Sequence, residues 1–65
     1  MFKIYFKNEM KRLGFKLGDI CDLLDMSRPT LNTRLENPKT FQVGEIDKLK
    51  QNNLVLPIEI IDNKL

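Results

Sequence analysis

The 65-residue sequence contains no histidine, no tryptophan and a single cysteine, Cys21. One cysteine cannot form an internal disulfide, and without histidine or further cysteines the chain lacks the ligands of a typical zinc site. Histidine is also the side chain that most often acts as a base at neutral pH, and no glycine-rich phosphate-binding loop is present. We therefore expect a protein that is not an enzyme and that uses no cofactor, metal or small-molecule substrate.

Long apolar runs are also missing. The longest clearly apolar stretches are residues 54–56 and 60–61, whereas a membrane-spanning helix needs roughly 20 residues. Residues 1–7 interleave lysines with apolar side chains, so they lack the continuous apolar core of a secretory signal. These features favour a cytoplasmic protein that does not enter a membrane.

The composition that remains is that of a small globular protein. Hydrophobic residues make up 42% of the chain and charged residues 31%. We expect residues 1–65 to form one domain that is stabilised by helix packing, by self-association or by both. The formal net charge is only +2, but residues 1–16 and 27–40 are basic and residues 17–26 are acidic. Such blocks can place a basic surface at one end of a fold, where it would suit phosphate groups.

Apolar side chains recur at helical spacing in four stretches of the chain. This periodicity predicts helices over residues 2–13, 17–24, 28–36 and roughly 41–51. Local signals mark the ends of the first and third helices. Gly14 stops the first, Ser27 caps the third with Pro29 in its first turn, and Asn37 ends the third because Pro38 follows it. The apolar face of the fourth helix is expected to consist of Phe41, Val43, Ile46 and Leu49.

Two parts of the chain have alternative interpretations. Residues 2–6 also alternate with period two, so a short strand before a helix capped by Asn8 is possible. After residue 54, the sequence is compatible with a short helix that begins at Pro57 or with a strand over residues 55–61. We expect an all-α domain of four or five helices with a central helix-turn-helix, and the alternative is an α+β fold with short terminal strands.

Two short helices joined by a three- or four-residue turn define a helix-turn-helix, and residues 17–36 meet that description. Cys21 falls where the two helices approach most closely, which favours a small buried side chain without a redox role. The core of this unit is expected to contain Ile20, Cys21, Leu24, Met26, Leu31 and Leu35.

Three short segments carry a resemblance to a known family. Residues 13–15 (Leu-Gly-Phe) lead into the unit, residues 20–21 (Ile-Cys) stand where the family has an apolar residue and then alanine, and residues 26–31 (Met-Ser-Arg-Pro-Thr-Leu) look like a turn and the start of a recognition helix. On these segments the chain resembles phage Cro- and repressor-type (lambda-repressor-like) helix-turn-helix DNA-binding proteins. The resemblance implies a sequence-specific regulator of transcription that binds double-stranded DNA, a small repressor of phage or mobile-element type. In that family, the α+β alternative is the Cro-like variant.

The side of the third helix opposite Leu31 and Leu35 is the expected reading surface, because the first turns of a recognition helix enter the major groove. Arginine and asparagine suit bidentate hydrogen bonds with guanine and adenine, respectively. The base-reading candidates are Arg28, Pro29, Thr30, Asn32 and Thr33. Flanking cationic and hydroxyl side chains suit phosphate contacts, which fix register without reading sequence. These candidates are Lys16, Ser27, Arg34, Lys39 and Thr40.

A single recognition helix reads few base pairs. Useful specificity therefore favours a homodimer on two half-sites of a DNA operator, about one helical turn apart. Residues 54–65 are the candidate dimerisation tail, and the alternative is that this tail folds against the first helix of its own chain. The alternative function is a helical protein-interaction module or anti-repressor that binds another protein instead of DNA.

Overall fold

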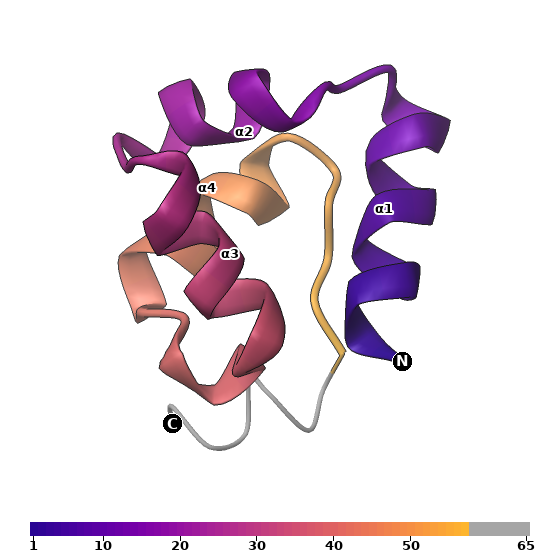
Figure 1. The fold of residues 1–65 in the computed structure, drawn as a ribbon. Coiled ribbons are helices and arrows are strands. Elements are labelled where there is room, and N and C mark those ends of the chain that lie inside the picture. Colours follow the sequence, from indigo (N-terminus) through magenta and orange to yellow (C-terminus); the bar gives the residue numbers. More distant parts are fainter. Residues whose placement is uncertain (58–65) are drawn as a thin grey trace.

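In the computed structural model, which describes residues 1–57, local sequence signals and the tertiary core together produce five helical elements. The α-helices are α1 (Phe2–Leu13), α2 (Leu17–Leu24), α3 (Arg28–Glu36) and α4 (Val43–Gln51), and a 3-10 helix, η1 (Pro38–Thr40), precedes α4. Figure 1 shows α2 across one end of the domain between α1 and α3, with α4 behind α3. Residues 1–57 contain no strand, so the all-α expectation is confirmed for them.

The strand considered for residues 2–6 does not form, because these residues belong to α1. The helix or strand considered after Pro57 lies outside the described residues.

Three residues with a positive φ angle end helices and redirect the chain. Gly14 has φ +79°, and Phe15 N–H then donates to the Met10 carbonyl at 2.8 Å. Asp25 adopts the same left-handed conformation after α2, with φ 53° and ψ 53°, and makes the tight turn into α3. Asn53 does so after α4, with φ 69°. The three helices therefore end by local hydrogen bonding at residue types that tolerate a positive φ angle, namely glycine, aspartate and asparagine.

The core lies where the apolar faces of all four α-helices meet. Its buried members are Phe6, Met10, Ile20, Cys21, Leu24, Leu31, Leu35, Phe41, Ile46, Leu49, Leu54 and Leu56. The helix-turn-helix core expected from the sequence is confirmed, with five of its six side chains buried and Met26 partly buried against the cluster. Cys21 is buried, which agrees with its expected role as a small apolar side chain.

Residues 53–56 run beside α1 of the same chain (Figure 1). The Tyr5 hydroxyl donates a hydrogen bond to the Val55 carbonyl, and Arg12 Nη2 donates one to the Asn53 carbonyl at 3.3 Å. Leu54 and Leu56 are buried in the core, whereas Val55 is 48% exposed. This first part of the tail thus packs against its own chain, and the rest of the candidate dimerisation tail, residues 58–65, lies outside the described residues.

The expected start of the fourth helix at residue 41 was wrong. Phe41 has an extended backbone (φ −58°, ψ 133°) and is fully buried, and α4 begins only at Val43. The Glu45 carboxylate accepts a hydrogen bond from Gln42 N–H at 2.9 Å and so caps the helix at that point. Val43, which was expected on the apolar face, is 49% exposed. The aromatic core decides where Phe41 lies, and this shifts the first turn of α4.

Gly18 in α2 offers a test of local helix energetics. Its backbone has no positive φ angle, and a β-carbon added there would lie 3.6 Å from Arg28 Nη2, which is an ordinary contact. We expect Gly18→Ala to raise the free energy of unfolding by about 0.5–1 kcal/mol, because alanine loses less backbone entropy on helix formation. Gly14→Ala is the matched control and should lower it by about 1–2 kcal/mol, because an L-residue is strained at that φ angle. Urea denaturation of both variants measures the difference, and an equal effect of the two changes would contradict this account.

Candidate nucleic-acid interface

The first turns of α3 are built by its N-cap. Ser27 Oγ accepts a hydrogen bond from Thr30 N–H at 3.3 Å, and Pro29 lies in the first turn, where the missing N–H leaves no helix bond unmade. Leu31 and Leu35 point into the core. The helix therefore holds its opposite side toward solvent, starting at its N-terminal end.

The structure places the base-reading candidates together on that side of α3. Arg28, Pro29, Asn32 and Thr33 are exposed, and Thr30 is half-buried. A helical repeat of 3.6 residues explains the separation, since the buried leucines lie four residues apart on the other face. These five side chains thus lie on one largely exposed surface, which we call the α3 outer face and which consists of Arg28, Pro29, Thr30, Asn32 and Thr33.

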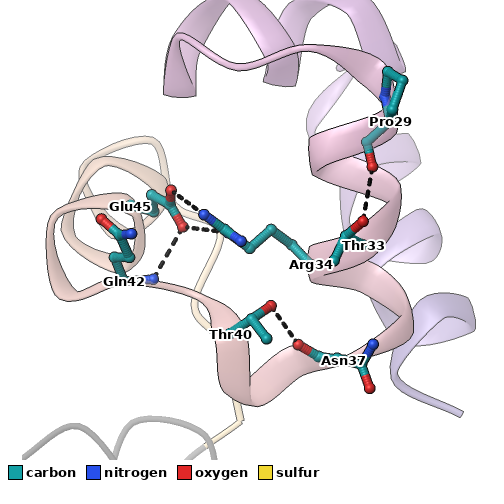
Figure 2. Close-up of polar contacts among 7 residues, drawn as sticks. All are labelled: Pro29, Thr33, Arg34, Asn37, Thr40, Gln42 and Glu45. Carbon is teal, nitrogen blue, oxygen red and sulfur yellow. Dashed lines mark hydrogen bonds and ion pairs between the residues drawn. The ribbon is translucent and has the colours of Figure 1, made fainter.

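Both threonine hydroxyls on the α3 outer face already have hydrogen-bond partners in the helix or at its N-cap. Thr33 Oγ1 donates to the Pro29 carbonyl at 3.1 Å, as Figure 2 shows, and the Ser27 and Thr30 hydroxyl oxygens lie 3.0 Å apart in a hydrogen bond. A hydroxyl has a single hydrogen to donate. Either Ser27 or Thr30 can be the donor in their hydrogen bond, whereas the Thr33 hydrogen is used. Sequence reasoning did not distinguish these hydrogen-bonded hydroxyls from the amide of Asn32 or the guanidinium of Arg28.

Arg28 extends from the start of α3 toward α2. Its Nη2 atom lies beside Gly18, in the first turn of α2, and Lys16 is the exposed residue at the N-cap of that helix. The Lys16 backbone N–H donates to the Asp19 carboxylate at 2.8 Å, so this residue is held in place by its backbone. One base-reading candidate and one phosphate-contact candidate are thus brought to the same edge of the helix-turn-helix.

Arg34 is held by an ion pair with Glu45. Its Nε and Nη2 atoms donate to the Glu45 carboxylate at 3.1 and 3.4 Å, and the two side chains are only 18% and 15% exposed. The same carboxylate accepts the Gln42 N–H, so it joins α3 to the first turn of α4 (Figure 2). Sequence reasoning did not identify Glu45, although a glutamate three residues after the N-cap residue of a helix is a recognisable capping signal.

The remaining phosphate-contact candidates lie on the segment after α3. Lys39 and Thr40 are both exposed in η1. The Thr40 hydroxyl donates to the Asn37 carbonyl at 2.7 Å and closes this turn (Figure 2). The hydrogen of the Thr40 hydroxyl is therefore used within the chain and is not free for a phosphate oxygen.

Glu36, the last residue of α3, forms an ion pair with Lys3 of α1. Lys3 Nζ lies 2.6 Å from Glu36 Oε1, in an exposed ion pair. This hydrogen bond, together with the positive charge of the Lys3 ammonium, holds the pKa of Glu36 below its usual value. The other acidic side chains close to the unit, Asp19, Asp22 and Asp25, are exposed on α2 and its turn.

Residues 1–57 hold no group of three or more histidine, cysteine, aspartate or glutamate side chains arranged to bind a metal ion. Among the helices in that range, none combines the length and the apolar character needed to cross a bilayer.

No protein-family model, no curated protein and no solved structure matches this chain. The fold and the geometry of the α3 outer face are therefore the physical basis for a function.

Proposed function

We propose that this protein is a sequence-specific regulator of transcription that binds double-stranded DNA, a small Cro-like repressor of phage or mobile-element type. The observation that supports it best is the division of α3 into two sides, with Leu31 and Leu35 buried and Arg28, Pro29, Asn32 and Thr33 exposed. A helix held in this way by a preceding helix and a tight turn can enter the major groove with its N-terminal end first.

In this proposal, the α3 outer face contacts the DNA bases, and the residues around it contact the sugar-phosphate backbone of the DNA. Arg28 donates two hydrogen bonds to guanine, and Asn32 pairs with adenine. Lys16, Ser27 and Lys39 contact phosphates, which set the register of the protein on the duplex. Thr40 lies beside them, and Arg34 joins them only if its pairing with Glu45 is exchanged for a phosphate.

A homodimer is the form that we propose for the DNA complex. Two copies place their α3 helices in successive major grooves, about 34 Å apart, and read two half-sites of one operator. In this proposal, the protein represses by occupying DNA that polymerase needs. It acts in the cytoplasm of the bacterial host, where that DNA lies.

In vitro selection from random duplexes, with the full chain, tests the proposal. We expect enrichment of a palindromic site whose affinity falls steeply with salt, because each neutralised phosphate contributes about −0.9 to the slope of log K against log salt. A chain that enriches no duplex, or whose binding is insensitive to salt, does not bind DNA in this manner. Binding of another protein in place of DNA would then be the better explanation.

Arg28→Ala tests the reading surface directly. We expect the affinity for the selected duplex to fall by about 1–3 kcal/mol in each half-site, with discrimination relaxed at one base pair. Arg12→Ala is the matched control, because it removes the same charge from α1, where Arg12 pairs with Glu9 at 2.9 Å. Fluorescence anisotropy measures both variants. Equal losses for the two would mean that only net charge matters and that Arg28 reads no base.

A further inference from the structure

Pro29 and Thr33 form a strip on the α3 outer face that has no hydrogen-bond donor left to offer. The Thr33 hydroxyl gives its hydrogen to the Pro29 carbonyl at 3.1 Å, and proline has no N–H. Both residues are exposed, and Figure 2 shows them one helical turn apart on the same side of α3. Beyond that hydrogen bond, the strip offers the Pro29 ring, the Thr33 methyl group and the lone pairs of Thr33 Oγ1, which can accept but not donate.

This strip differs from its neighbours on the same face. Asn32 and Arg28 are exposed and carry amide and guanidinium donors, and no hydrogen bond among the described residues uses their side chains. A base edge that consists of acceptors only, such as that of guanine, is therefore matched by Arg28 or Asn32 and not by the strip. Opposite Pro29 and Thr33, such an edge would lose its hydration without gaining a donor.

The major groove offers one apolar group that suits such a surface. Every natural base edge there consists of donors and acceptors except at the 5-methyl group of thymine. The same methyl group occurs on 5-methylcytosine. We propose that the Pro29–Thr33 strip is a binding site for the 5-methyl group of a pyrimidine in the major groove. This inference rests on the proposed function and specifies part of the DNA that the protein recognises.

The first experiment changes the DNA alone, so it does not depend on the folding of a variant. The probe is the tightest duplex recovered by selection, with each thymine replaced in turn by deoxyuridine. At one position in each half-site we expect affinity to fall about fourfold, which corresponds to the transfer of one methyl group from water. At that position, 5-methylcytosine should bind about fourfold more tightly than cytosine for the same reason. The first comparison tests thymine as the source of the methyl group, and the second tests 5-methylcytosine.

Variants of the strip then locate the contact on the protein. Thr33→Val keeps a methyl group and removes the hydroxyl, and we expect it to retain the preference for thymine over uracil. In Pro29→Ala/Thr33→Ser, which keeps the hydroxyl but removes the ring and the methyl group, the preference should fall to about one, since the apolar contact is gone. Thermal unfolding followed by circular dichroism verifies that each variant is folded at the assay temperature.

The results that overturn the proposal are distinct from those that overturn the function. If duplexes are enriched but no deoxyuridine or 5-methylcytosine substitution changes affinity, the strip does not bind a methyl group, although the protein still binds DNA. The proposal is also refuted if Thr33→Val loses the preference for thymine over uracil while the double variant retains it. That result would assign the contact to the Thr33 hydroxyl. If no duplex is enriched, the proposed function fails and this inference fails with it.

Discussion

Phe41→Ala is expected to leave the domain largely unfolded at room temperature. Phe41 is fully buried, and its ring centroid lies 5.9 Å from that of Phe2 and 6.1 Å from that of Phe6. It therefore attaches the connection before α4 to the apolar face of α1. Truncation of a buried phenylalanine costs about 3–5 kcal/mol, from lost burial and from the cavity that remains. A single core of this size supplies about 3–5 kcal/mol in total, so the loss is comparable with the whole stability.

Circular dichroism in increasing urea measures this effect. The matched control is Val43→Ala, two residues further on, where the side chain is 49% exposed and the expected change is within about 0.5 kcal/mol. A cooperative transition for Phe41→Ala within 1 kcal/mol of the parent protein would show that the aromatic cluster does not carry the stability assigned to it here.

Removal of one partner of the Arg34–Glu45 pair is expected to have the next largest effect. The carboxylate of Glu45 accepts hydrogen bonds from the Arg34 guanidinium and from Gln42 N–H, and both charged side chains are mostly shielded from water. We expect Glu45→Ala to lower the free energy of unfolding by about 2–3 kcal/mol, because a charged hydrogen bond and a helix cap are lost together. The Arg34 charge is also left without its partner.

A double-mutant cycle separates the pair from the cap. Arg34→Met removes the charge and keeps much of the side-chain length, and Glu45→Gln keeps a polar group of the same shape. We expect the two changes to be non-additive by about 1–2 kcal/mol, since directly contacting residues couple in this range. Fully additive effects would mean that the ion pair contributes no stability.

The same Arg34→Met variant has a second use once a DNA site is known. If Arg34 also contacts a phosphate, the slope of log K against log salt should become shallower by about one in each half-site. If the guanidinium stays with Glu45, the substitution affects DNA affinity only indirectly, through the orientation of α3. The slope of log K against log salt is then unchanged. The two roles of this side chain are thus distinguishable in one titration.

Much of the helical framework was predictable because its signals are local. The predicted bounds of the first three helices agree with α1, α2 and α3. Their stops and starts depend on Gly14, Ser27 and Pro29, which act on backbone groups within a few residues of themselves. The buried and exposed sides of α3 follow in turn from the spacing of Leu31 and Leu35, so the exposure of the predicted base-reading residues was largely accessible as well.

The sequence by itself therefore determined the helix periods, their local caps and the two-sided character of α3. Tertiary structure decided which partner Arg34 takes and how the chain after α4 packs, and together with the local Glu45 cap it decided where α4 begins. Arg34 meets a carboxylate 11 residues away, and the Tyr5 hydroxyl meets a carbonyl 50 residues away. Such contacts depend on how the helices pack in three dimensions. Periodicity and capping motifs do not predict that packing, because they reflect interactions between residues that are close in the sequence. The same reason applies to Phe41, whose burial against α1 outweighs the helical pattern of its neighbours.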